Sequence, residues 1–344
     1  MELIKQYLPE DYITKAKCSQ VKFFNEENKK SNPWKEKKKR NFSVASSYGD
    51  ASLKNKATRM NMCANVLQFK MTSAGRKLAY AWFCKVRLCP MCNWRRSLKI
   101  ANENREIVLA ANRQEKVRWL FLTLTTGETV YGKDLKDRIE YSMKAFNRLM
   151  KYKKVQQVVR GYFRGLEITK NKKRYHPHFH VLLAVKPSYF NNFYINKREW
   201  ASLWENALKT DCPVVIDIRT VKPNKKHEKL NSDKVQAFEG ALQEVSKYPV
   251  KDIDLLNGNR QENAMTVYTI EQAISHKRLI GYGGILKKIR SELKLKNNDA
   301  LQENIIHIDE TCEDLIAQEI EIITAYWHYG IQEYVMNKKT DSSE

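Results

Sequence analysis

Residues 161–185, GYFRGLEITKNKKRYHPHFHVLLAV, decide our prediction of the fold. The polar run KNKKR separates two runs rich in apolar residues, Gly161–Thr169 and His178–Val185. This pattern is typical of two antiparallel strands joined by a turn. Successive side chains of a strand point to opposite faces, so His178 and His180 share one face while Phe179 points into the core on the other.

The residue pattern of this strand pair predicts a metal-binding site. Paired residues of antiparallel strands share a face, so the turn can bring Glu167 opposite His178 or, two residues along, opposite His180. Either register puts a carboxylate beside two imidazoles, and Gly165 leaves room on that face. Two histidines and one carboxylate suit Mg²⁺ or Mn²⁺ bound to a phosphate oxygen. The alternative is a set of surface or hydrogen-bonded histidines.

The flanking segments predict an α+β fold with a central, mainly antiparallel sheet flanked by helices. Residues 118–125, RWLFLTLT, alternate like a strand, with Thr123 and Thr125 on the face opposite the leucines. We expect these threonines to form the floor of the metal site. Further elements are expected from apolar spacing: helices over 94–113, 134–152, 190–209 and 232–247, and a strand over 214–221.

The charge of the chain points to a polyanionic partner. Its 344 residues contain 62 Lys and Arg against 39 Asp and Glu, a net charge of +23. Residues 51–100 hold 11 basic residues and no acidic one, whereas residues 291–344 hold 4 basic and 12 acidic residues. Such a field favours nucleic acid, with a solvated basic surface as the alternative. We find neither a membrane-spanning apolar run nor a signal peptide, and we expect a cytoplasmic protein.

Four cysteines within residues 61–93 predict a structural zinc site. Cys89 and Cys92 form a CxxC knuckle, Cys84 lies five residues before it, and Cys63 lies a further 21 residues back. Four thiolates can close a tetrahedral zinc site. Cys63 is the least certain of the four ligands because of its distance in sequence, and buried free thiols are the alternative.

A candidate nucleophile lies further along the chain, in EVSKYPVK. Glu244 and Tyr248 are four residues apart, which is one helical turn, and Lys251 follows. A phenol beside a metal and a lysine can attack phosphorus, and a carboxylate can activate water as a general base. Taken alone, a Glu–Tyr pair at this spacing is more often ordinary packing.

The order FLTLTT, RGLEITKNKKRYHPHFHVLLAV and EVSKYPVKDID resembles the rolling-circle replication initiators of small bacterial plasmids. These proteins belong to the single-tyrosine branch of the HUH endonuclease superfamily. The resemblance also covers PWKEKKKRN, CKVRLCPMCNWRRSLK and GYGGILKKI, so it runs from about residue 33 to 290. It implies an HUH core with a palm-like sheet. From the residues themselves we expect a zinc-knuckle region before this core and a helical C-terminal region after it.

The resemblance also implies roles for individual residues. His178 and His180 match the paired metal ligands, and Glu167 matches the acidic position before them. Tyr248 matches the nucleophile that leaves a 5′-phosphotyrosine and a 3′-hydroxyl, and Glu244 matches the residue assigned to activating water at termination. His176 fits the pattern as a ligand, a general base or a partner of a ligand, and its role stays open.

We divide the chain into four regions on this basis. Residues 1–60 are expected to form a basic arm, 61–113 a cysteine-rich zinc and DNA-binding region, 114–260 the endonuclease domain, and 261–344 a helical region with an acidic tail. The residues expected to contact DNA are Lys37, Lys38, Lys39, Arg40, Arg87, Arg95 and Arg96.

The expected partners are origin DNA in double- and single-stranded form, a host helicase and a second copy of the chain. Two other functions remain open. One is a relaxase or transposase of the same superfamily, which would re-join the strand and gain nothing from a hydrolytic glutamate. The other is a non-catalytic, zinc-containing repressor, whose DNA binding would survive removal of a catalytic ion.

Overall fold

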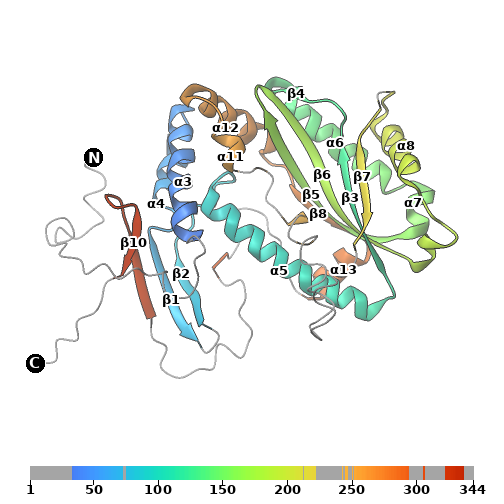
Figure 1. Ribbon diagram of the computed structural model, residues 1–344, viewed down its shortest axis with the longest axis horizontal. Helices are drawn as coiled ribbons and strands as arrows, with labels where there is room; N and C mark the ends of the chain where they lie inside the picture. Colours follow the sequence, from blue (N-terminus) through green and yellow to red (C-terminus); the bar gives the residue numbers. More distant parts are fainter. Residues whose placement is uncertain are drawn as a thin grey trace, which may run out of the picture.

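The computed structural model describes residues 33–72, 75–211, 213–221, 242, 245–246, 250, 252–293, 305–306 and 322–336. Its larger sheet has six antiparallel strands, five of them in the order β7-β3-β6-β5-β8, with β4 also paired to β6 (Figure 1). These strands are β3 Arg118–Thr125, β4 Val130–Tyr131, β5 Val159–Asn171, β6 Arg174–Val185, β7 Ile216–Thr220 and β8 Ile280–Gly283.

The two faces of this sheet pack into two different cores. Leu122, Phe179 and Leu183 belong to the main core, which also contains buried residues of α6 (Leu135–Leu149) and α8 (Lys197–Leu208). Phe121 and Leu182 point the other way, into a smaller core with α5 (Pro90–Gln114) and α13 (Gly284–Glu292). Because both faces are covered by apolar packing, polar side chains within the sheet need a specific reason to be there.

A second sheet has four strands in the order β10-β9-β1-β2. Its strands are β1 Val66–Thr72, β2 Gly75–Ala81, β9 Ile322–His328 and β10 Glu333–Met336. Helix α3 (Pro33–Asp50) packs against this sheet through Trp34, whose ring meets Phe69 edge-on at 5.8 Å. Helix α4 (Lys54–Met62) packs on α3 and leads through Cys63 into β1.

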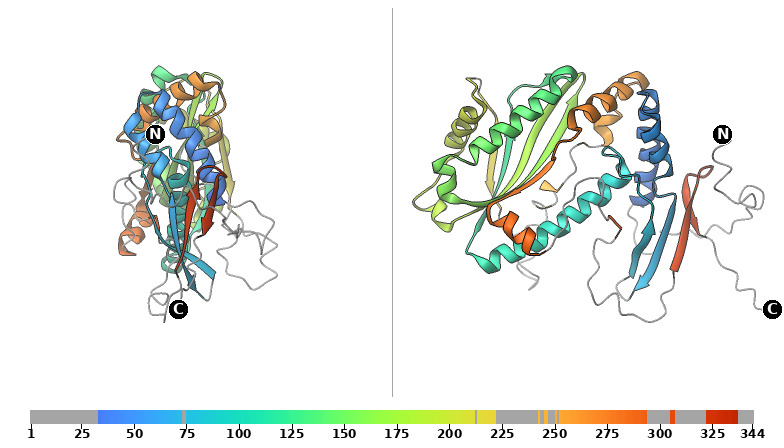
Figure 2. Two further views of the ribbon diagram at one scale, coloured as in Figure 1. Left: turned by 90° about the vertical axis from the view of Figure 1, so that its left-hand side faces the viewer. Right: turned by 180° about the vertical axis from the view of Figure 1, so that it is seen from behind.

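Two helices connect the parts that carry these sheets. Helix α5 runs from the smaller sheet to the larger one (Figures 1 and 2). Helix α12 (Arg260–Ile274) packs on both α3 and α6. Its buried Glu271 accepts a hydrogen bond from the Tyr48 hydroxyl at 2.5 Å and forms an ion pair with Lys56. The remaining elements are α7 Lys153–Val158, α11 Asp252–Leu255 and the short 3₁₀ turns Gly132–Asp134 and Pro187–Phe190.

The structure confirms the α+β class and the strand pair from which the prediction started. The expected strand over 118–125 is β3 with the same bounds, and the expected helices over 94–113, 134–152 and 190–209 correspond to α5, α6 and α8. The helix expected over 232–247 lies almost wholly outside the described residues.

Two expectations about the ends of the chain were wrong. Residues 33–60 form packed helices rather than an arm, because α3 and α4 bury Val44, Tyr48 and Met60 completely. The C-terminal region is not helical throughout: α12 and α13 are followed by strands β9 and β10, and β9 pairs along β1.

Residues 1–32, most of 294–321 and 337–344 lie outside the described residues, and the four domain boundaries stay predictions. None of the described helices has the length and apolar character needed to cross a membrane.

Candidate functional site

The strand register brings Glu167, His178 and His180 to one place. Glu167 pairs with His178, and Gly165 pairs with His180 on the neighbouring step of the same face. On the other side of β6, Thr123 pairs with His180 and Thr125 with His178. The first of the two registers left open by the sequence is therefore the observed one, and the two threonines lie beside the histidines as expected.

Glu167 is the centre of this group. Its Oε2 lies 2.7 Å from Nε2 of His180 and 3.2 Å from Nε2 of His178, and only 5% of the residue is exposed. Burial disfavours the charged carboxylate, but the hydrogen bonds and charges of the two histidines outweigh it and hold the pKa of Glu167 far below its usual range. The carboxylate is therefore ionised and aimed between the two imidazoles.

The Nδ1 atoms of the two imidazoles, which face away from Glu167, have neighbours that orient the rings for metal binding. Nδ1 of His178 lies 3.2 Å from the carbonyl oxygen of His176, which can only accept a hydrogen bond, so Nδ1 donates to it and Nε2 is the ring nitrogen that faces Glu167 and is available to a metal ion. Nδ1 of His180 lies 3.3 Å from Oγ1 of Thr123. One ligand atom from each of the three residues lies within 4.8 Å of the others. This donor set can hold a divalent cation.

His176 lies beside this group without joining it. Its ring centre is 5.6 Å from that of His178, and Nε2 is buried without a hydrogen-bond partner among the described residues. Burial and the nearby His178 lower the pKa of His176 below the usual histidine value, which favours a neutral ring. The structure places His176 next to the site, and its role stays a prediction.

The segment that holds the predicted nucleophile approaches the same face. Glu244, Tyr248 and Lys251 lie outside the described residues, but Val245 and Ser246 are described. The carbonyl oxygen of Val245 lies so close to Gly165 that an added Cβ would be 2.7 Å away. Ser246 Oγ accepts a hydrogen bond from Asn104 of α5 at 3.0 Å, and Asn104 accepts one from the hydroxyl of Tyr282. Asn104 was missed in the sequence, because an asparagine in a polar helix gives no signal for a distant partner.

The four cysteines form a second, fully buried cluster. Sγ of Cys63 lies 3.7 Å from those of Cys89 and Cys92, and Sγ of Cys84 lies 3.6 Å from that of Cys92. A metal with bonds of about 2.3 Å to four tetrahedral sulfurs separates the sulfurs by roughly 3.8 Å, which these contacts match. All four are free thiols. Cys63, the doubtful ligand in the sequence, belongs to the cluster, and the group could hold a metal ion.

Three residues expected to contact DNA are instead buried around this cluster. Lys38 is fully buried and donates to the carbonyl oxygens of Cys63 at 2.5 Å and Asn61 at 3.1 Å, while burial lowers its pKa to about 8. Arg96 donates to the carbonyls of Lys85 and Val86, and Arg95 to those of Ile305 and Ile306. The prediction that these three side chains contact DNA is wrong, because each buried ammonium or guanidinium group is engaged with backbone carbonyl oxygens instead.

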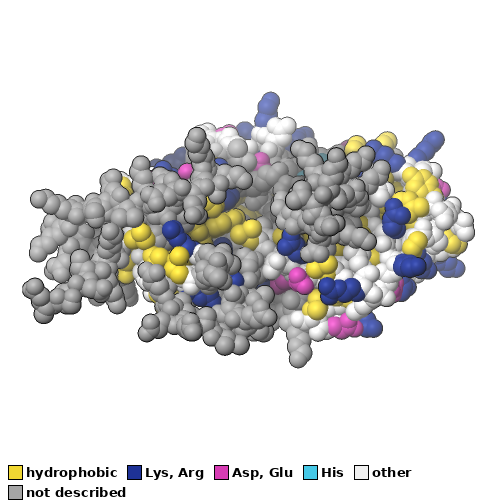
Figure 3. All heavy atoms as spheres, turned by 60° about the horizontal axis from the view of Figure 1, so that its bottom comes forward, with side chains coloured by type: hydrophobic (Ala, Val, Ile, Leu, Met, Phe, Trp, Pro, Cys, Tyr) yellow, Lys and Arg dark blue, Asp and Glu magenta, His cyan; other side chains and the backbone are white. Residues whose placement is uncertain are grey.

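The other basic residues are more open. Arg87 is half-buried and donates to the carbonyls of Ile274 and Lys277, whereas Arg40 is exposed and Lys37 and Lys39 are half-buried on α3. Figure 3 shows Lys and Arg side chains spread over the described part of one face of the molecule. The DNA assignment of Lys37, Lys39, Arg40 and Arg87 stays a prediction.

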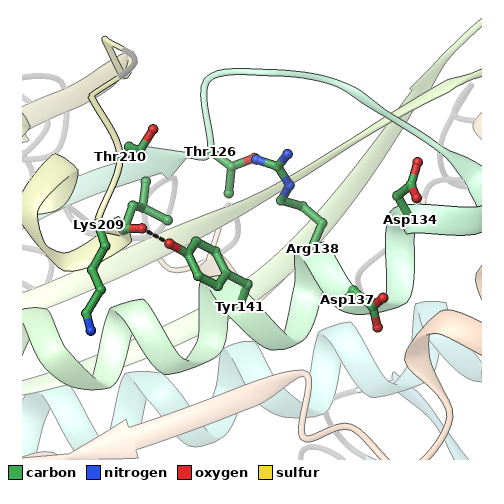
Figure 4. A pocket seen from close by; sticks show the side chains of 8 residues that line it. Thr126, Asp134, Asp137, Arg138, Tyr141, Lys209 and Thr210 are labelled. Atoms are coloured by element: carbon green, nitrogen blue, oxygen red, sulfur yellow. Dashed lines mark hydrogen bonds between the residues drawn. The ribbon is translucent and has the colours of Figure 1, made fainter.

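A hollow between α6 and α8 is a less suitable site. Figure 4 shows Tyr141 at its centre, with the hydroxyl donating to the carbonyl oxygen of Leu208. Two carboxylates and two cations balance each other in its lining, so it offers no net charge to a phosphate chain. Its lining residues are Thr126, Asp134, Asp137, Arg138, Tyr141, Leu208, Lys209 and Thr210.

Comparison with known proteins assigns the chain to a family. A model of the replication protein family matches residues 75–335. The chain belongs to the replication protein family. This replication protein is 46% identical over 324 residues to a "Protein rep" of Bacillus amyloliquefaciens. The aligned residues cover 89% of this chain and 94% of that relative. A "Protein rep" of Lentilactobacillus hilgardii is 38% identical over 312 residues, with 89% and 96% covered. No solved structure matches the chain.

Membership of the replication protein family confirms the resemblance to plasmid replication initiators that the order of the motifs indicated. The matched residues include Cys84, Cys89 and Cys92, the whole β5–β6 hairpin and strand β9. Both candidate metal sites of this replication protein therefore lie mainly in the part of the chain that defines the family.

Proposed function

We propose that this replication protein nicks one strand of plasmid origin DNA through a tyrosine nucleophile, and that the freed 3′-hydroxyl primes rolling-circle replication. The observation that carries the proposal is the convergence of Glu167, His178 and His180 on one face of the central sheet. In this proposal the six-stranded sheet is the palm-like core of an HUH endonuclease, and origin DNA is its substrate.

Glu167, His178 and His180 would hold Mg²⁺ or Mn²⁺. The bound ion would supply Lewis-acid polarisation of a phosphate oxygen at the scissile bond. The chain itself orients the ligands: the carbonyl of His176 fixes the tautomer of His178, and Thr123 fixes the ring of His180. His176, with its neutral ring, is close enough to act as a partner of the bound phosphate or of a ligand.

Tyr248 is the proposed nucleophile. Its phenolic oxygen gives up its proton and forms a bond to phosphorus, and the bond from phosphorus to the 3′-oxygen breaks. The 5′ end of the strand is then joined to Tyr248, and the 3′-oxygen takes up a proton to become the primer. Lys251 neutralises phosphate charge. At termination, Glu244 removes a proton from water, and the resulting hydroxide attacks the phosphorus. The bond from phosphorus to the Tyr248 oxygen breaks, the phenolic oxygen takes up a proton, and the DNA is released with a 5′-phosphate.

The described part of the nucleophile segment supports this assignment. Val245 lies against Gly165, which is the strand partner of His180, and Ser246 is tied to α5 through Asn104. Tyr248 follows Val245 by three residues in the sequence. A segment fixed in this way is suited to hold a nucleophile close to a phosphate at the histidines, and positioning of this kind is a large part of catalysis.

We propose zinc as the ion of the cysteine cluster, held by Cys63, Cys84, Cys89 and Cys92. Four sulfur donors at the observed separations suit Zn²⁺, whose sites of this kind are structural. Helix α3 and the turn at Arg87, both held in place around the ion, would then present Lys37, Lys39, Arg40 and Arg87 to duplex DNA. A host helicase and a second copy of the chain stay predicted partners.

The decisive experiment uses the full chain, Mn²⁺ or Mg²⁺ and supercoiled DNA of its own replicon. The wild-type protein should nick one strand at one position and form a covalent protein–DNA adduct on a denaturing gel. Tyr248→Phe should abolish the adduct, because no phenolic oxygen remains to attack. Tyr194→Phe, which changes an exposed tyrosine beyond the far end of β6, should leave the adduct unchanged.

Three outcomes would contradict the proposal. An adduct of wild-type yield with Tyr248→Phe would exclude that residue as the nucleophile. Unimpaired termination by Glu244→Ala would favour a relaxase or transposase, which re-joins the strand instead of hydrolysing it. Origin binding without nicking under any divalent metal would favour a repressor.

A further inference from the structure

The face of the sheet that carries the histidines extends beyond them toward the β5–β6 turn. Side chains on β6 alternate, so Arg174 lies on the same face as His176, His178 and His180. Tyr131 of β4 pairs with Arg174 and therefore shares this face, while its neighbour Val130 pairs with Tyr175 and is buried in the main core.

Tyr131 is an exposed aromatic residue that the protein holds in place. Half of it is exposed, at 50%. The guanidinium of Arg174 lies over its ring at 4.3 Å from the centre, and Nη2 of Arg174 donates to the Tyr131 hydroxyl at 3.1 Å. Nη1 of Arg174 donates to the carbonyl oxygen of Thr129 at 3.2 Å, which fixes the guanidinium as well. One face of the ring is thus covered by a cation.

Such an arrangement has the features of a base-stacking site for single-stranded DNA. Proteins that bind single strands combine aromatic side chains, on which bases stack, with positive charge that follows the phosphates. Here the charge comes from Arg174 itself and from Lys172 and Lys173 in the exposed turn next to it. A ring fixed before binding loses little conformational freedom when a base stacks on it.

We propose that Tyr131, held by Arg174, binds one base of the single strand a few nucleotides from the phosphate that is cut. The proposal rests on the proposed nicking function, because it names a further contact of the same substrate. Arg174 and His178 are four residues apart on β6, which corresponds to about 13 Å. Stacked nucleotides rise by about 3.4 Å each, so the stacked base lies up to roughly four nucleotides from the scissile phosphate.

Binding measurements test this directly and need no cleavage. Full-length Tyr248→Phe protein is titrated into fluorescein-labelled (dT)15, and the dissociation constant is read from fluorescence anisotropy. Adding Tyr131→Ala should weaken binding about tenfold, which is the usual size of one lost base stack. Tyr131→Phe keeps the ring and should bind within about twofold of the parent, since stacking needs the ring and not the hydroxyl.

The salt dependence separates stacking from charge. Tyr131→Ala removes no positive charge, so the slope of log dissociation constant against log salt should stay the same. Tyr194→Ala removes a tyrosine that is 59% exposed near the other end of β6 and is the matched control. Its affinity should stay at the parent value.

A scan of abasic positions then locates the base. A set of oligonucleotides that span the mapped nick, each lacking one base, is bound to the parent protein and to the protein with Tyr131→Ala. The parent should lose about tenfold in affinity when one particular base is missing, and the protein with Tyr131→Ala should lose no further affinity at that position. An unchanged affinity of Tyr131→Ala for (dT)15, an equal loss with Tyr131→Phe or Tyr194→Ala, or identical abasic profiles would overturn the proposal. Nicking by the protein with native Tyr248 is scored separately, so a failed stacking site and a failed nicking function give different results.

Discussion

Replacing Gly165 with alanine tests whether the nucleophile segment is positioned by the sheet beneath it. The added methyl carbon would lie 2.7 Å from the carbonyl oxygen of Val245, whereas ordinary contacts begin at 3.4 Å. The segment must therefore move away by about 0.7 Å. Gly165 is not among the residues with positive φ, so the backbone accepts alanine and the methyl group is the whole perturbation.

The displacement predicts a selective loss of catalysis. A misplacement of about 1 Å can reduce an enzymatic rate about 100-fold, so we expect single-turnover nicking to slow by roughly 10- to 100-fold. Mn²⁺ affinity, measured by titration calorimetry, should not change, because Glu167, His178 and His180 keep their places. Overpacking of this kind should also lower the free energy of unfolding by about 1–3 kcal/mol.

Gly49→Ala is the matched control, since nothing lies within 4 Å of the methyl group that it adds. It should nick like the wild-type protein, and its stability should stay at or slightly above the wild-type value, since Gly49 lies in the last turn of α3. Nicking by Gly165→Ala at the wild-type rate would refute the positioning argument. A parallel loss of Mn²⁺ affinity would refute it too, because the methyl group would then act on the metal ligands.

Three further predictions follow from side chains already described. Glu167→Gln should weaken Mn²⁺ binding at least tenfold in calorimetry, because it removes the anionic ligand, and an unchanged affinity would exclude this carboxylate from the site. Cys63→Ser should reduce zinc measured by mass spectrometry from about one ion per chain toward none and lower the melting temperature, whereas full zinc content would leave the cluster with three ligands. Glu271→Gln removes the charge paired with Lys56 and should cost about 1–3 kcal/mol in urea unfolding. Asp50→Asn, which breaks the exposed ion pair with Arg260, should leave the urea midpoint nearly unchanged.

The central hairpin could be predicted because its signals are local. Alternation decided which side chains share a face, and a short polar turn limited the register of Glu167 to two possibilities. The same reasoning placed Thr123 and Thr125 on the site face before the pairing of β3 with β6 was known. The cysteines were also found from spacing, although only the fold of α4, β1 and β2 brings Cys63 to the other three.

The errors came from contacts between residues far apart in the sequence. Strand β9 pairs with β1, and its β-branched and aromatic residues, IITAYWH, are typical of a strand. The acidic stretch with helix-like spacing before it led the prediction to extend the helical region through it. Lys38 lies in a run of lysines that is typical of a solvent-facing helix. The sequence does contain a signal for its burial, because Lys38 lies at helical spacing from Trp34, Asn41 and Ala45 and so shares their helix face. The structure buries all four residues.

Helix α5 is a rigid connection between the cysteine cluster and the part of the protein that carries the histidines. Cys89 and Cys92 lie at its first turn, and its last turns pack beneath the sheet that carries the histidines. At about 1.5 Å per residue, its 25 residues span about 37 Å without a joint. Under the proposed function, duplex DNA binds near the cysteine cluster and is cut at the histidines, so this rigid helix would set the separation between the bound element and the nick. Origins used by this protein should then tolerate changes of sequence between the bound element and the nick far better than insertions that alter their separation.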